Sequence, residues 1–199
     1  LVQNLIEKQV PFNLSDAVAA AAKEQPIECA AETQQAVVEF IVGRLKNYLL
    51  SADFRYDVVD AVLAEQNNNP AVAHQACKEL TKWMQHKEWD SILPAYSRCV
   101  RITRDKKKTY TINEAYFVND AEKELYTATQ TLESAVKNNA DVNSFFEALL
   151  PVIPAINAFF DAVLVMDEDQ NVRKNRLGLL QMISNTTRGI IDLSFVEGF

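Results

Sequence analysis

The sequence predicts an all-α protein, built as a bundle of about eight to nine helices. Three observations lead to this class. Apolar side chains recur every three or four residues along most of the chain, which is the spacing of an amphipathic helix. Only four of the 199 residues are glycine. Hydrophobic residues make up 48% and charged residues 24% of the chain, so a sizeable core is available at this length.

The predicted organisation is a single domain over residues 1–199, because no internal repeat and no low-complexity linker divides the chain. The first residues already have a helical pattern, and no capping residue precedes them. The apolar members of this first helix are Leu1, Val2, Leu5 and Ile6. We therefore expect a fragment of a longer chain, whose first helix continues from a missing N-terminal part and ends near Pro11.

Four further helices are predicted in the N-terminal half, and asparagine and proline residues mark several of their ends. They cover about residues 14–24, 32–50, 55–65 and 71–86. Asn13 or Ser15 can cap the first of these, and Pro26 ends it. Pro70 follows "NNN" and suits the first position of the fourth.

Another four helices are predicted in the C-terminal half. They cover about residues 88–107, 120–138, 141 onward and 170–187. Asn119 or Asp120 caps the second, Asp141 opens the third, and Asp169 precedes the last. Residues 107–120 have no clean period, so we expect an ordered loop with at most a tiny hairpin. The apolar tail "IIDLSFVEGF" is expected to dock on the bundle.

One stretch, residues 145–165, is apolar enough to be compared with a membrane span. It contains Glu147 and Asp161, and a spanning helix would bury both carboxylates at a cost of several kcal/mol. Pro151 and Pro154 would also break such a helix. The stretch therefore predicts a pair of core helices and no membrane partner.

The composition excludes several classes of function. The net charge is −7, so binding to RNA would have to depend on a local basic patch, and we expect no DNA binding. The three cysteines are scattered without a CxxC pair, which indicates reduced thiols in a cytosol-like compartment. Neither histidine has a cysteine at ligand spacing, and no P-loop, GxGxxG, HExxH or GxSxG motif is present. We therefore predict no metal site and no catalytic centre in this chain.

The most distinctive basic feature lies near the end of the helix predicted at 88–107. Its members are Arg98, Arg101, Arg104, Lys106, Lys107 and Lys108. At about 100° per residue, the arginines and Lys108 fall within an arc of roughly 120°. Tyr96 and Tyr110 flank them and could stack on unpaired bases. Two interpretations follow: contact with RNA, or a solvated helix end whose lysines are favoured by the helix dipole.

Other basic candidates are scattered along the chain. Arg55 and Tyr56 lie between two predicted helices and beside Asp57, where they could grip a splayed base or form a local ion pair. Arg44 lies on the long helix, where it could contact RNA or simply be surface charge. Arg173 is a further RNA candidate. A structural polar network is also predicted, in which Arg176 pairs with Asp161 or Asp57, with Asp60 nearby. 

Three stretches in order resemble one protein family. They are "RLKNYLLSADFRYDVVDAVLA" at 44–64, "NDAEKELY" at 119–126, and "FFDAVLVMDEDQNVRKNRL" at 159–177. In these stretches the chain is similar to the C-terminal anticodon-binding domain, of the DALR type, of bacterial glycyl-tRNA synthetase β subunits. Residues 97–108 depart from the common pattern of that family and keep only Arg98 and Ile102. This variant is similar to cyanobacterial and plastid sequences.

The resemblance implies a role in translation. The full enzyme would be a ligase that joins glycine to its tRNA using ATP and magnesium, with its catalytic centre in an α subunit or a fused α part. This chain would bind the anticodon stem-loop of glycine tRNA and assemble with the rest of the β subunit and with the α subunit. The implied compartment is the cytoplasm, or alternatively the plastid stroma.

An alternative function is a helical adaptor that binds another protein through its apolar tail and grooves. Salt distinguishes the two hypotheses, because binding to phosphates weakens steeply as salt is added, whereas apolar docking does not.

Overall fold

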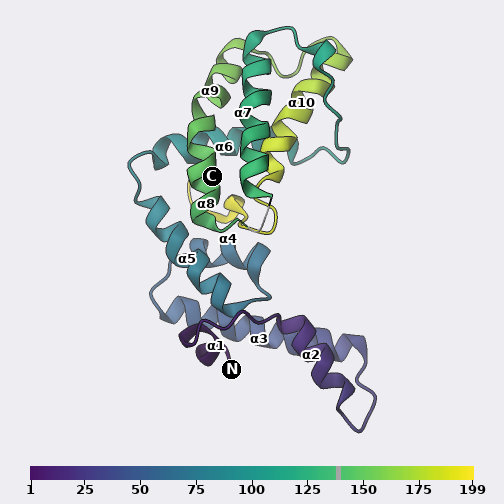
Figure 1. Ribbon diagram of the computed structural model, residues 1–199, viewed down its shortest axis with the longest axis vertical. Helices are drawn as coiled ribbons and strands as arrows, with labels where there is room; N and C mark the ends of the chain where they lie inside the picture. The colour runs from purple at the N-terminus through teal and green to yellow at the C-terminus, as the bar shows by residue number, and fades with distance from the viewer. Residues whose placement is uncertain (138–139) are drawn as a thin grey trace. The chain divides into compact units, whose positions relative to one another are not determined.

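The computed structural model describes residues 1–137 and 140–199 and confirms the all-α class (Figure 1). The described residues contain α-helices and three short 3-10 helices, and no strand. They form two compact units. The first unit comprises Leu1–Lys82 with Gly189–Glu197, and the second comprises Trp83–Arg188 with Gly198–Phe199. That the two units act together as one domain remains a prediction.

The first unit is built from the N-terminal helices. These are α1 (Val2–Glu7), α2 (Leu14–Lys23), α3 (Ala31–Ser51), α4 (Tyr56–Gln66) and α5 (Pro70–Met84), the last of which continues past the end of the unit. The long helix α3 packs against α1, α2 and α4, and Leu45 and Leu49 are fully buried on it. The predicted docking of the tail is confirmed. The main-chain N–H of Asp192 donates to Ala61 O at 2.9 Å, and η3 (Leu193–Phe195) packs against α4.

The second unit contains the remaining helices. They are α6 (Trp89–Thr103), η1 (Glu114–Tyr116), α7 (Asp120–Val136), α8 (Val142–Leu149), η2 (Leu150–Val152), α9 (Ile153–Ala162) and α10 (Gln170–Asn185). Helix α7 packs against α8 and α9, and α10 packs against α6 and α7. Figure 1 shows α7, α9 and α10 side by side in this unit.

The apolar stretch Val142–Ala162 is the only described helical stretch with the length and composition to cross a membrane. In the structure it is broken by η2 at Pro151, as the sequence predicts. Phe145, Phe146 and Phe159 within it are fully buried in the second unit. The prediction that it forms a pair of core helices is therefore confirmed.

The predicted caps are confirmed, and they show why the helices begin where they do. The side chain of Asn13 accepts from Asp16 N at the start of α2. Asn119 accepts from Ala121 N at the start of α7. Asp141 and Asp169 accept main-chain N–H groups at the starts of α8 and α10. Each cap satisfies N–H groups that have no partner within the helix.

One helix boundary was predicted wrongly. The sequence suggests a helix to residue 107, but α6 ends at Thr103. The hydroxyl of Thr103 donates to Cys99 O at 2.8 Å, and the chain then turns away from the helix axis. The physical reason is tertiary, because the side chain of Gln181 on α10 binds the main chain that follows, at Lys108 and Tyr110.

Candidate nucleic-acid interface

The arginines of α6 lie on an exposed face and rest on aromatic rings. The guanidinium carbon of Arg98 is 4.1 Å from the centre of the Phe160 ring. That of Arg101 is 5.8 Å from the centre of the Phe199 ring. Both arginines are exposed, so each planar group is steadied by a ring while it stays accessible to a ligand. The sequence did not identify the two phenylalanines, because no local pattern links them to α6.

The opposite face of α6 is buried, and this corrects one prediction. Tyr96 is only 2% exposed. Its hydroxyl hydrogen-bonds Ser184 O at 3.1 Å and Thr187 Oγ1 at 2.9 Å. The prediction that Tyr96 could stack on an unpaired base is therefore wrong, because its ring belongs to the core. Burial also raises the pKa of the Cys99 thiol to about 12, so the neighbouring arginines do not activate it.

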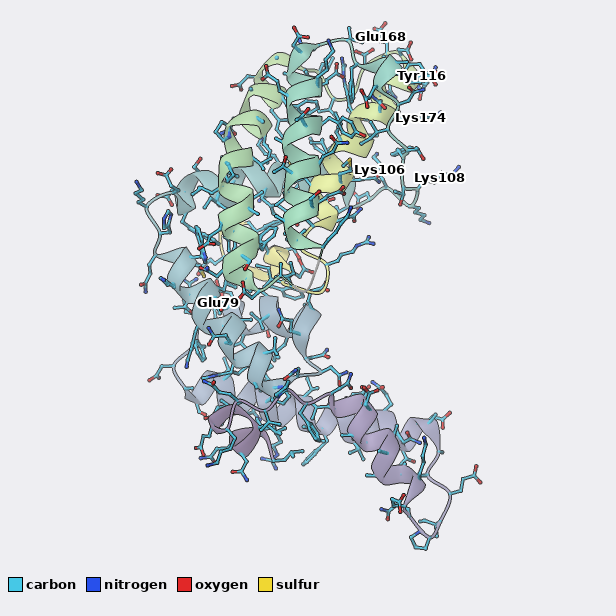
Figure 2. The ribbon with its side chains drawn as sticks, in the orientation of Figure 1. Glu79, Lys106, Lys108, Tyr116, Glu168 and Lys174 are labelled. Carbon is cyan, nitrogen blue, oxygen red and sulfur yellow. The ribbon has the colours of Figure 1, made fainter. Side chains whose placement is uncertain are left out.

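Lys108 is not on the helical arc predicted for it, because all three lysines follow the end of α6 at Thr103. They belong to residues 104–113, here called the lysine segment. Lys107 and Lys108 are exposed and Lys106 is half-buried. Figure 2 shows Lys106 and Lys108 beside α10, on the same side of this unit as Lys174 and Tyr116. The six basic residues predicted to act together therefore lie on two surfaces: the arginines of α6, and the lysines of the segment beside α10.

Asp167, Glu168 and Asp169 form an acidic corner before α10, and Arg176 binds this corner through Asp167. The partners of Arg176 differ from the predicted ones. Arg176 Nε donates to Glu122 Oε1 at 2.6 Å, and Nη1 donates to Asp167 Oδ2 at 2.7 Å and to Leu164 O at 2.9 Å. Asp161 is exposed and is not a partner, so the predicted pairing with Asp161 is wrong.

Glu122 is a partner of Arg176 that the sequence did not predict. It is fully buried, and its second oxygen accepts from Val118 N and Asn119 N, each at 2.7 Å. It thereby caps α7 while it pairs with α10. The spacing of Asn119 and Glu122 is that of a capping box, and this local signal could have found the first of its two roles.

Asp167 and Arg173, beside Arg176, are less buried than Arg176 and also form hydrogen bonds at this corner. A hydrogen bond from Asp169 N, helped by Arg176, lowers the pKa of Asp167, so this carboxylate stays charged. Arg173 is half-buried, and its Nε donates to Asp167 O at 2.6 Å. Its role as an RNA ligand remains a prediction.

The first unit holds the other candidates. Arg55 forms a two-pronged pair with Asp57 at 3.0 and 2.8 Å, and it also reaches Glu197 at 2.9 Å. The predicted pairing of Asp57 with Arg176 is therefore wrong. Burial alone would raise the pKa of Asp57, but hydrogen bonds from Glu197 N and Arg55 lower it overall. Tyr56, adjacent to this pair, is 63% exposed.

The first unit also contains an ion pair and a cation–π contact that involve predicted residues. Asp60 pairs with Lys46 and not with Arg176, so it does not belong to the predicted network. Arg44 lies over the Phe40 ring at 5.2 Å, on an exposed part of α3. Among residues 1–137 and 140–199, no group of three or more His, Cys, Asp or Glu side chains could hold a metal ion.

Comparison with known proteins shows relatives along most of the chain. It is 34% identical to a chloroplastic/mitochondrial glycine–tRNA ligase of Arabidopsis thaliana, over all of this chain and 19% of that protein. It is 33% identical to a glycine–tRNA ligase beta subunit of Lactobacillus helveticus, over 82% of this chain and 23% of that protein. A beta subunit of Clostridioides difficile is 32% identical over 82% of this chain and 24% of its own length. The chain therefore spans about a fifth to a quarter of these relatives.

A family model gives the assignment. The model of the DALR anticodon binding domain matches residues 92–194, which include most of α6, the lysine segment, the partners of Arg176 and α10. The resemblance seen in the sequence motifs is thereby confirmed. Because the match covers more than half of the chain, this protein belongs to the family of DALR anticodon-binding domains.

Proposed function

We propose that this chain binds the anticodon stem-loop of glycine tRNA and holds that tRNA for aminoacylation. The observation that carries the proposal is the concentration of cations at residues 98–108, where five of six arginines and lysines are exposed in a chain of net charge −7. Local charge of this kind repels itself, and a polyanion offsets that cost. The family assignment and the names of the relatives support the choice of tRNA as that polyanion.

The geometry favours different RNA contacts for the arginines and for the lysines. Arg98 and Arg101 present planar guanidinium groups that rest on rings, and such groups suit base edges and phosphates alike. The lysines are point charges and suit phosphates. We therefore assign base contacts to α6 and phosphate contacts to the lysine segment, which begins at Arg104 directly after α6.

The remaining parts of the proposal concern the whole enzyme. The chain would act within glycine–tRNA ligase, which uses ATP and magnesium, with the catalytic centre in the α subunit or a fused α part. Its protein partners would be the rest of the β subunit and the α subunit, in the cytoplasm or the plastid stroma. By itself the chain is expected neither to activate glycine nor to hydrolyse ATP.

For the alternative function as a protein-binding adaptor, the structure shows that the tail is buried but that apolar side chains near α3 are exposed. The apolar tail is not free for a partner, because Ile190, Ile191, Leu193 and Val196 are buried in the first unit. Ile27 and Phe40, in contrast, are 76% and 63% exposed on or near α3. Protein binding through that face stays the second candidate.

The test is a titration of the 199-residue chain with glycine tRNA and with an anticodon-altered tRNA, each at two salt concentrations. We expect tighter binding to glycine tRNA, and affinity that falls steeply with salt because phosphate contacts release counterions. Arg98→Ala should weaken binding by about 1–3 kcal/mol and reduce discrimination at one anticodon letter if it reads a base. Equal, salt-independent binding of both tRNAs, or no binding, would contradict the proposal.

A further inference from the structure

Over Lys107–Ile112, the main chain of the lysine segment is held by side chains and not by other described main-chain groups. Between Lys107 and Ile112, no main-chain to main-chain hydrogen bond occurs within the described residues. Instead, Gln181 Nε2 donates to Lys108 O at 2.8 Å, and Gln181 Oε1 accepts from Tyr110 N at 2.9 Å. One amide thus binds the segment at two points, as a neighbouring strand would.

Two more residues of α10 continue the same contact. Asn175 Oδ1 accepts from Asn113 N at 2.7 Å. Between them, a Cβ atom on Gly178 would lie 2.9 Å from Tyr110 O and 3.1 Å from a side-chain carbon of Ile112. Only a glycine lets the segment come this close to the helix.

The three positions form one face of α10, because they are three residues apart. As α10 runs from Asn175 through Gly178 to Gln181, it meets the segment in the reverse order, from residue 113 back to residue 108. The part of the segment from 108 to 113 is therefore a strap that runs antiparallel to α10. Tyr110 and Ile112 are half-buried against the unit, whereas Lys107, Thr109 and Thr111 are exposed.

Packing alone does not explain why Asn175 and Gln181 are polar. Asn175 and Gln181 are 2% and 7% exposed, and a buried amide costs free energy unless it is hydrogen-bonded. The Nδ2 atom of Asn175 is buried without a partner in the described part of the chain, so part of that cost is not recovered. An apolar side chain would fill either position at less cost but would release the strap.

We propose that Gln181, Gly178 and Asn175 are positioning residues for RNA binding, which hold the strap against α10 so that its lysines reach one phosphate backbone together. This inference rests on the proposed function. A strap that is ordered before binding loses less conformational freedom when RNA arrives. Lys174, the neighbour of Asn175 on α10, is exposed and adds a cation on the same side (Figure 2).

The test uses Gln181→Met, which keeps the volume and removes both hydrogen bonds, and Gly178→Ala, which places a Cβ against Tyr110 O. Matched controls are Gln130→Met on an exposed position of α7 and Gly43→Ala, where a Cβ would meet nothing within 4 Å. Affinity for the anticodon stem-loop of glycine tRNA is measured at several salt concentrations, and thermal unfolding is recorded for each variant. We expect each α10 variant to bind about 3- to 10-fold more weakly, with a shallower dependence on salt. Both controls should bind like the parent.

A double-mutant cycle separates positioning from a general loss of stability. In a chain with Lys106, Lys107 and Lys108 all changed to Ala, measured at low salt, Gln181→Met should cause no further loss of affinity and no further change of salt slope. If the triple change leaves RNA binding untouched, the role proposed for the lysines fails and the inference falls with it. If the triple change weakens binding but both α10 variants match the parent, the proposed function stands and the positioning role is refuted. A full Gln181→Met effect in the triple background would refute it as well.

Discussion

Each of the two units holds an arginine between two carboxylates, and the two clusters differ mainly in their exposure to water. In the second unit, Arg176 is 6% exposed and pairs with Glu122, whose side chain is 0% exposed. In the first unit, Arg55 is 51% exposed and pairs with Asp57, whose side chain is also 0% exposed. The comparison shows that the same chemistry serves two purposes. The Arg176 cluster joins α7, the acidic corner and α10, whereas the Arg55 cluster leaves a cation at the surface.

The two clusters also differ in the hydrogen-bond donors that each buried carboxylate would keep if its arginine were removed. Glu122 would still cap α7 through Oε2, but Oε1 would lose the hydrogen bond from Arg176 Nε. Both oxygens of Asp57 would keep main-chain donors, Val58 N on one and Glu197 N on the other. A buried charge left without compensation is costly, and the cost falls as other donors remain.

The largest expected effect is therefore that of Arg176→Met. It should lower the free energy of unfolding by about 3–5 kcal/mol, because Glu122 stays buried without its cation. Chemical denaturation of parent and variant measures this loss. Lys174→Met, at an exposed position of the same helix, is the control and should change stability by less than about 0.5 kcal/mol.

A smaller effect is expected for Arg55→Met. We expect a loss of about 1–2 kcal/mol, because the arginine is half exposed and Asp57 keeps its main-chain donors. The same denaturation experiment measures it. Equal losses for Arg55→Met and Arg176→Met would show that burial does not distinguish the two clusters.

A third prediction concerns how the free energy of unfolding changes at acid pH. The pKa of Asp57 is lowered from its ordinary value of 3.8, so its carboxylate stabilises the fold above that value. This contribution is lost as the pH falls through the lowered pKa. The stability difference between parent and Asp57→Asn should thus be largest at about pH 7 and shrink below about pH 4. A difference that grows on acidification would contradict the lowered pKa.

The smallest effect is expected for Glu197→Gln. The Glu197 side chain is 70% exposed where it meets Arg55, so we expect a change of less than about 0.5 kcal/mol. Its main-chain N–H, which donates to Asp57, is not altered by this substitution. A loss comparable to that of Arg55→Met would mean that the outer carboxylate matters more than its exposure suggests.

The sequence by itself determined the helices and the location of the basic residues. Caps such as Asn13, Asn119 and Asp169 could be predicted because a cap binds N–H groups two or three residues away. The break at Pro151 is equally local, because a proline ring cannot continue a helix. The exposed arginines of α6 follow from helical period alone.

Only the tertiary structure decided which groups meet. Tyr96 shares α6 with Arg98, and the packing of α10 made it a core residue. The end of α6 at Thr103 and the path of the lysine segment depend on Gln181, more than seventy positions away. Arg176 pairs with Glu122 across 54 positions of sequence and does not pair with the predicted Asp161 or Asp57. Such partners cannot be found from spacing, because a long-range pairing depends on which helix faces the core brings together.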